Sequence, residues 1–197
     1  IYGYAVIPEG KELVIDAGTR VHFHKDSGML VKSNASVQIN GTLSTDQDVL
    51  ENEVIFSGDR LESELSNVPG QWGTVWITPG STNNTINHLT LKNATVGLFV
   101  DGDGSLESPT LTLTNSQIYN SASVNLWAKT AAVIAENVVL GSSGNTSLYC
   151  NLGGKYEFVH CTIANYWGNG FRGGPALELD NFGESGSGGL EKAEFFN

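Results

Sequence analysis

The stretch that decides the fold runs from residue 86 to residue 163, where one five-residue phrase occurs four times. In chain order the phrase reads LTLKN at 89–93, LTLTN at 111–115, VIAEN at 133–137 and YEFVH at 156–160. Apolar and polar residues alternate in each phrase, which indicates a β-strand and not a helix. The last positions are 22, 22 and 23 residues apart, a spacing typical of a repeat in which strands stack on one another.

The last position of each phrase suits a turn, because asparagine tolerates the left-handed backbone region and its amide bonds to nearby groups. Stacked asparagine side chains can also bond to one another along a column. The predicted structural ladder consists of Asn93, Asn115, Asn137 and His160. We therefore predict an all-β fold, a single-stranded parallel β-helix, with one coil for each repeat.

A single domain spans residues 1–197 in this interpretation, as a solenoid of about eight or nine coils. Residues 193–197 read AEFFN and match the phrase once more, with Asn197 at the last position. The chain is thus expected to stop inside a coil and to be truncated at its C-terminal end. Because an open strand edge favours pairing with another chain, further coils or an oligomeric partner are expected to cover that edge.

Composition narrows the classes of partner. The formal charge is −11, from 10 basic and 21 acidic residues, which disfavours nucleic acid and anionic membrane surfaces. No apolar run is long enough to form a transmembrane segment. Two cysteines, Cys150 and Cys161, are too few for a disulfide framework; we expect buried free thiols and leave their disulfide state open.

Several segments resemble a known group of proteins. Residues 6–21, 39–43, 54–59 and 72–77 resemble the first coils of right-handed parallel β-helix proteins of the pectin-lyase-like superfamily. Residues 158–167 are similar to exported, often lipid-anchored β-helix proteins of Gram-negative gut commensals, which are mostly uncharacterised. The resemblance covers nearly the whole chain and implies right-handed coils, in line with the general handedness of parallel crossovers. It also implies an exported protein at the cell surface or outer membrane, and a lipid anchor is one way in which such a protein would be attached there.

That superfamily contains polysaccharide lyases and glycoside hydrolases, so the resemblance implies an enzyme as the alternative. The Asn-Thr-Asp, Asp-Asp and Gly-His-Gly signatures of its polygalacturonases do not occur in this sequence. Glu136 and Glu157 are predicted to be neighbours on one strand face, with Lys92 two coils from Glu136. An ordinary solvated strand face accounts for the same residues, and we predict no catalytic residue.

The best candidate ligand site is a glycine-rich loop that carries Tyr166, Trp167, Phe171 and Arg172. Aromatic faces stack on sugar rings, and arginine can bond hydroxyl or carboxylate groups. The alternative is that Tyr166 and Trp167 fold back as packing. Asp101 and Asp103 are weak candidates for a calcium site, because the full ligand pattern is missing; otherwise we expect no cofactor.

The leading functional hypothesis is a non-catalytic surface scaffold or binding module. The sequence does not specify its ligand, and polysaccharide is the candidate partner. The alternative is a polysaccharide lyase or glycoside hydrolase that acts on an outward strand face. A calcium-stabilised structural adhesin is a third class.

Overall fold

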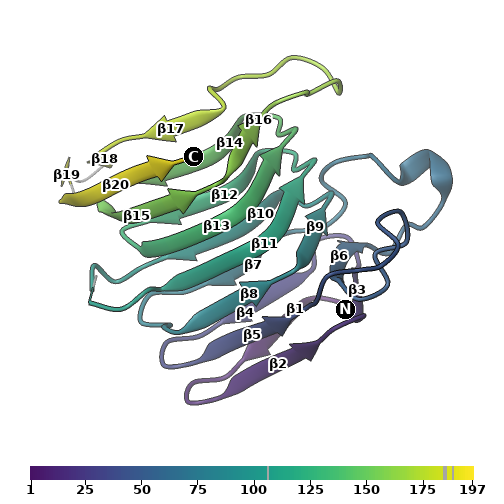
Figure 1. Ribbon diagram of the computed structural model, residues 1–197, viewed down its shortest axis with the longest axis horizontal. Helices are drawn as coiled ribbons and strands as arrows, with labels where there is room; N and C mark the ends of the chain where they lie inside the picture. The colour runs from purple at the N-terminus through teal and green to yellow at the C-terminus, as the bar shows by residue number, and fades with distance from the viewer. Residues whose placement is uncertain (106, 184–185, 188) are drawn as a thin grey trace.

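The structure is a computed structural model that describes residues 1–105, 107–183, 186–187 and 189–197. Its regular secondary structure among these residues is almost entirely β-strand, in two large parallel sheets that face each other, as Figure 1 shows. The only helix in that part is a short 3-10 helix, η1 (Ser63–Leu65). No helix among the described residues is both long enough and apolar enough to cross a bilayer.

The smaller sheet has seven strands. Its hydrogen-bonded order is β1 (Tyr4–Ile7), β4 (Gly28–Val31), β7 (Val75–Ile77), β10 (Val96–Asp101), β12 (Val124–Lys129), β14 (Thr146–Asn151) and β17 (Leu177–Leu179). Every neighbouring pair is parallel. Parallel neighbours require crossovers, and these crossovers supply the strands of the other sheet.

The larger sheet has 11 strands. Its main row is β2 (Glu12–Asp16), β5 (Ser36–Asn40), β8 (Asn84–Asn87), β11 (Leu111–Tyr119), β13 (Ala132–Gly141), β15 (Gly154–Val159) and β20 (Leu190–Phe196). Its second row is β3 (Arg20–Phe23), β6 (Val54–Gly58), β9 (Leu89–Lys92) and β16 (Thr162–Ala164). The long strands β11 and β13 pair with members of both rows and so join them. A separate antiparallel pair is formed by β18 (Phe182–Gly183) and β19 (Gly186–Ser187).

The larger sheet curls into a half-barrel because β11 and β13 bend in their middle. Asn115 and Asn137 have φ angles of 49° and 54° within these strands. In β11 the buried side chains are Leu111 and Leu113 before the bend, but Ser116 and Ile118 after it. One left-handed residue therefore shifts the in–out alternation by a position and turns the strand, so that both halves keep facing the core.

The core lies between the two sheets and consists mainly of aliphatic side chains. The smaller sheet contributes Val75, Leu98, Leu126 and Leu148, and the larger contributes Ile86, Leu113 and Phe158. Full burial of each such side chain contributes about 1.5–3 kcal/mol relative to exposure. Trp72 is buried beside them, where its ring stacks on Phe23 with the centroids 4.2 Å apart.

The predicted single-stranded, right-handed β-helix with a uniform coil is wrong. The strands divide between two separate sheets of seven and 11 strands, the larger one a curled half-barrel. The 22-residue repeat is also local: Leu111 pairs with Val133 at that offset, but Met29 pairs with Val75 and Thr90 with Gln117. Connections of unequal length separate the remaining strands, so no regular solenoid repeat extends along the chain.

Candidate functional site

A groove of about 240 Å³ lies where β11 ends, between two long loops. The loops are residues 59–71, which follow β6, and residues 165–176, which follow β16. The groove is lined by Asn67, Tyr119, Asn120, Ser142, Tyr166, Gly168 and Asn169. We call it the amide groove, because three of its lining side chains are asparagines.

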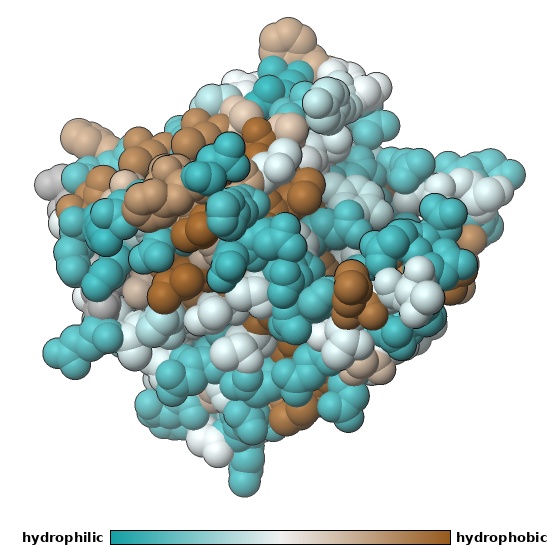
Figure 2. Space-filling view, viewed as in Figure 1, coloured by the Kyte–Doolittle hydropathy of each residue, from teal (hydrophilic) through white to brown (hydrophobic). Residues whose placement is uncertain are grey.

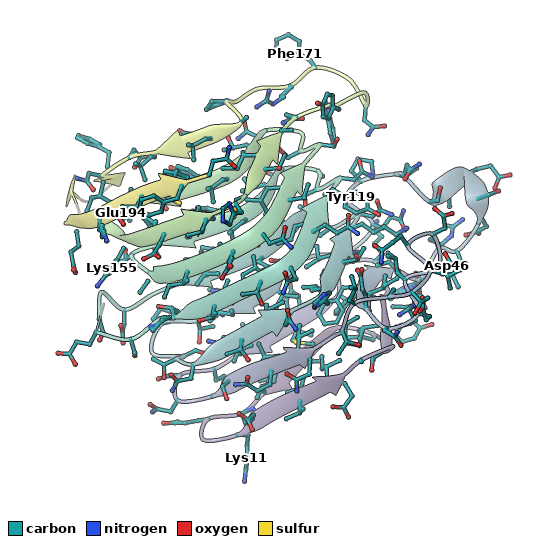
Figure 3. The ribbon with its side chains drawn as sticks, in the orientation of Figure 1. Lys11, Asp46, Tyr119, Lys155, Phe171 and Glu194 are labelled. Carbon is teal, nitrogen blue, oxygen red and sulfur yellow. The ribbon has the colours of Figure 1, made fainter. Side chains whose placement is uncertain are left out.

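Tyr119 and Asn120 form the floor of the amide groove, and their positions follow from the strand that precedes them. Ile118 points into the core, so the next residue, Tyr119, points outward, at the point labelled in Figure 3. Asn120 then has a φ angle of 58°, a left-handed conformation that ends the strand. Both residues thus lie on the rigid end of a long strand.

Asn120 links the two loops that flank the groove. Its side-chain Nδ2 donates to the carbonyl oxygen of Asn67 and to Oδ1 of Asn93, each at 2.7 Å. Its Oδ1 accepts from Nδ2 of Asn169 at 3.3 Å. Asn93 in turn donates to the carbonyl oxygen of Ser66 at 2.9 Å. Asn120 is only 6% exposed and its bond to Asn93 is buried, whereas the bonds to the loop residues are partly buried. Together these bonds connect both loops to the end of the strand.

Two tyrosines give the groove its aromatic character. Tyr166 is 86% exposed, so most of its ring surface is free to contact a ligand. Burial raises the pKa of the Tyr119 hydroxyl, with a smaller contribution from the negative charge of Glu53. The Tyr119 hydroxyl therefore stays protonated at neutral pH and can both donate and accept a hydrogen bond.

The four predicted ligand residues separate in the structure. Tyr166 lines the amide groove, whereas Phe171 is 98% exposed and points away from the molecule at the loop tip (Figure 3). Trp167 folds back and is half-buried, with its Nε1 buried and without a hydrogen-bond partner among the described residues. Arg172 donates from Nε to the carbonyl oxygen of Asn145 at 3.1 Å. Of the four, Tyr166 is the one that lines a groove described for this part of the chain.

The predicted ladder holds in part. Nδ2 of Asn137 donates to Oδ1 of Asn115 at 2.9 Å, and Nδ2 of Asn115 donates to Oδ1 of Asn87 at 2.9 Å. His160 follows β15 in register with Asn137 and has a φ angle of 52°. Asn93 does not belong to this column, so that part of the prediction is wrong. Its partner is Asn120, because Leu91 pairs with Ile118 and not with Leu113.

Sequence reasoning missed Asn67, Asn120 and Asn169. A signal for Asn120 was present: Asn93 and Asn120 each come two residues after a strand-forming apolar residue, Leu91 or Ile118. The phrase at 111–115 ends at Asn115, so the repeat does not include Asn120, which directly follows the same strand. Asn67 and Asn169 lie in loops without periodicity, so nothing in the sequence placed them beside Asn120.

The calcium candidates carry other contacts. Asp101 is almost buried and forms an ion pair with Lys129, with 3.2 Å between the carboxylate and Nζ. Oδ1 of Asp103 accepts the backbone N–H of Ser105 at 2.9 Å, as in a turn. Within the residues that the structure describes, no three His, Cys, Asp or Glu side chains lie close enough together to hold a metal ion.

The candidate catalytic residues are spread over different surfaces. Glu157 pairs in register with Ile134 and lines a groove of about 180 Å³ with Lys155 and Lys192. Glu136 pairs with Val159 and is not among the lining residues of that groove. Lys92 lines another groove, of about 100 Å³, on the second row of the sheet. The three side chains thus do not form one site.

The cysteines are both free thiols. Cys150 is buried in the core, and burial raises the pKa of its thiol strongly. Cys161 is half-buried, and burial raises its pKa as well. Both thiols are therefore protonated at neutral pH and poor nucleophiles.

No protein family, curated protein or solved structure matches the chain. The resemblance to the pectin-lyase-like superfamily is contradicted by the two-sheet fold and has no support in these comparisons. The lipid-anchored class of gut-commensal proteins and the lipoprotein interpretation fall with it.

Proposed function

We propose that this protein is a non-catalytic binding module for carbohydrate, and that the amide groove is its site. The observation that carries the proposal is the meeting of an exposed aromatic ring, Tyr166, with two hydrogen-bonded amide groups, those of the buried Asn120 and the exposed Asn169. Sugars offer both an apolar ring face and a rim of hydroxyl groups. The groove offers the complementary surfaces side by side.

Each part of the groove has a defined task in this proposal. The Tyr166 ring stacks on the apolar face of a sugar residue. The Asn169 amide keeps one N–H group and its Oδ1 for a sugar hydroxyl, which both donates and accepts. Both N–H groups of the Asn120 amide are donated to Asn67 and Asn93, so Asn120 orients Asn169 through its Oδ1. The hydroxyl groups of Ser142 and Tyr119 add two further contacts of the same kind.

The size of the groove limits what it can hold. At about 240 Å³ it is smaller than the cavities of about 300–1,000 Å³ that bury drug-sized ligands. It therefore suits one sugar residue, at the end or along the side of a chain. None of the described lining residues is charged at neutral pH, which supports binding of a neutral sugar and argues against acid–base catalysis at this place.

The network around Asn120 supports binding at low entropic cost. The loops 59–71 and 165–176 are already connected through Asn67, Asn120 and Asn169. A ligand then meets a formed surface and does not have to order two loops.

The test is a screen of neutral and charged glycans against the wild type, followed by titration calorimetry with the best ligand. Tyr166→Ala is expected to weaken binding about tenfold, the value of one aromatic stacking contact. Phe171→Ala is the matched control, because Phe171 is an aromatic residue of the same loop that is also largely exposed and does not line the groove. The control should bind as the wild type does.

Two results would contradict the proposal. One is that no glycan of a broad panel binds the wild type. The other is that Tyr166→Ala and Phe171→Ala change the affinity equally. Non-specific contact with the exposed aromatic residues of the loop, and not a defined groove, would then account for binding.

A further inference from the structure

A second groove, of about 100 Å³, neighbours the amide groove. The loop 59–71 contributes Ser66 to the second groove and Asn67 to the amide groove. The sheet contributes Lys92 to the second groove and Tyr119 to the amide groove, and these two residues pair in register on adjacent strands. Adjacent strands lie about 4.8 Å apart, so the two grooves are close enough for one extended ligand to reach both.

Hydrogen bonds fix the two grooves relative to each other. Asn93 lines the second groove, and its Nδ2 donates to the carbonyl oxygen of Ser66 at 2.9 Å. Oδ1 of Asn93 accepts from Nδ2 of Asn120, which lines the amide groove, at 2.7 Å. The network that connects the loop 59–71 to the sheet therefore also joins the second groove to the first.

The second groove carries positive charge. Arg60 and Lys92 both line it, and none of its described lining residues is acidic. We call it the cationic groove for that reason. The amide groove differs, because no charged residue is among its described lining residues.

Lys92 lies on the outer face of the sheet, since it follows the buried Leu91 at the end of β9. Leu91 pairs with Phe56, also buried, so Ser57 on the neighbouring strand points outward beside Lys92. Lys92 is half-buried, and no ion pair among the described residues includes it. A partly desolvated ammonium group is stabilised by an anion beside it, and a ligand can supply that anion.

Arg60 supplies a second positive charge but already has a partner in its own loop. Its Nη2 donates to Oε1 of Glu62 at 3.0 Å, whereas its Nη1 takes no part in this pair. The two side chains are 60% and 53% exposed, and exposed ion pairs contribute little. The nearby Asp59 bonds to Nδ1 of His24 at 2.7 Å. Lys92 is therefore the main cation of the groove.

The size and surroundings of the cationic groove indicate a small polar occupant. Its volume is less than half that of the amide groove, which suits one sugar residue, so it suits a substituent and not a whole sugar ring. The loop 59–71, which carries η1 in Figure 1, is mainly hydrophilic in Figure 2.

We propose that the cationic groove binds an anionic substituent, a carboxylate or a sulfate ester, on a glycan whose neutral residue occupies the amide groove. Lys92 supplies the charge, and Nη1 of Arg60 adds a donor. This inference rests on the proposed function and specifies its ligand as an acidic glycan in which a charged residue adjoins an uncharged one.

The test is titration calorimetry with two pairs of tetrasaccharides at physiological salt. Each pair consists of an acidic molecule and the same molecule without its charge. Hyaluronan and its carboxyl-reduced form test a carboxylate, and carrageenan and its desulfated form test a sulfate ester. We expect the acidic member of at least one pair to bind about tenfold more tightly than its neutral counterpart, because one charge-assisted contact is added. The pair that shows this difference identifies the anionic group.

Variants of Lys92 assign the difference to the cationic groove. Lys92→Gln is expected to remove the preference and to leave the affinity for the neutral member unchanged, whereas Lys92→Arg should keep most of it. Lys11→Gln is the matched control, because Lys11 is an exposed lysine that lies far from Tyr119 in Figure 3. Circular dichroism should show that all three variants keep the fold.

Equal binding of the two members of each pair would overturn this inference but not the proposed function, because a neutral sugar would still bind. A preference that persists in Lys92→Gln would overturn it as well. Binding of no tetrasaccharide, charged or neutral, would also overturn it, whereas the broader glycan panel decides on the proposed function.

Discussion

Two corners of the larger sheet carry asparagines with positive φ, and they present different surfaces. At the first corner, Asn115 and Asn137 are exposed and bond to each other along the stack. At the second corner, Asn93 and Asn120 are buried and bond to each other and to loops. The same residue type therefore maintains a bend at one corner and anchors a groove at the other.

The length of the neighbouring connections makes the difference. At the first corner, the strand simply continues after the bend, and only a one-residue turn is needed. At the second corner, loops 59–71 and 165–176 extend beyond the sheet and fold against the asparagine side chains. The stacked strands thus fix where the asparagine side chains lie. At the second corner, the irregular loops fold against these side chains and form the groove.

The largest expected effect is at the second corner. Asn120→Gly keeps the positive φ but removes the hydrogen bonds to Asn67, Asn93 and Asn169. We expect a loss of about 2–3 kcal/mol in the free energy of unfolding, because one buried and two partly buried bonds are broken. Urea denaturation measures this loss. Both loops should also be released, so trypsin should cleave faster at Arg60 and Arg172. An unchanged cleavage rate would show that Asn120 does not anchor the loops.

A smaller effect is expected at the first corner. Asn137→Gly keeps the bend and removes one exposed side-chain bond to Asn115. The expected loss is about 0.5–1 kcal/mol in the free energy of unfolding, with no change in trypsin cleavage of the loops. Urea denaturation beside Asn120→Gly makes the comparison direct. Equal losses in the two variants would remove the distinction between the corners.

The smallest expected effect concerns pH. Burial raises the pKa of Tyr119, so the folded protein holds this proton more tightly than the unfolded chain. Stability is therefore retained at neutral pH and falls as pH rises above about 10, the pKa of an exposed tyrosine. Tyr119→Phe should reduce the slope of melting temperature against pH in that range. Tyr149 and Tyr156 shift in the same direction, so the slope should not disappear. An unaltered slope would contradict a buried Tyr119 hydroxyl.

Much of the local structure could be predicted from the sequence. The alternation in residues 111–115 and 133–137 correctly indicates strands, and Asn115 and Asn137 lie in register as their 22-residue spacing suggests. The all-β class is also correct. These features depend on neighbours along the chain, where period and turn chemistry give direct signals.

The arrangement of the strands could not be predicted in the same way. Asn93 was aligned with Asn115 by spacing, although the actual pairing of Leu91 with Ile118 aligns it with Asn120. The spacing of two matching phrases does not show how many of the residues between them belong to loops, so it does not determine which residues pair. The amide groove depends on loop contacts of Asn67 and Asn169 that no periodicity encodes. The cell-surface location stays a prediction.

The most direct test of the proposed site is the set of asparagine side-chain amide signals in ¹H–¹⁵N NMR spectra, recorded with and without the best glycan from the screen. The account predicts that the signals of Asn120 and Asn169 shift on binding, while those of Asn115 and Asn137 stay in place. Shifts at Asn115 and Asn137 with none at Asn120 and Asn169 would contradict it.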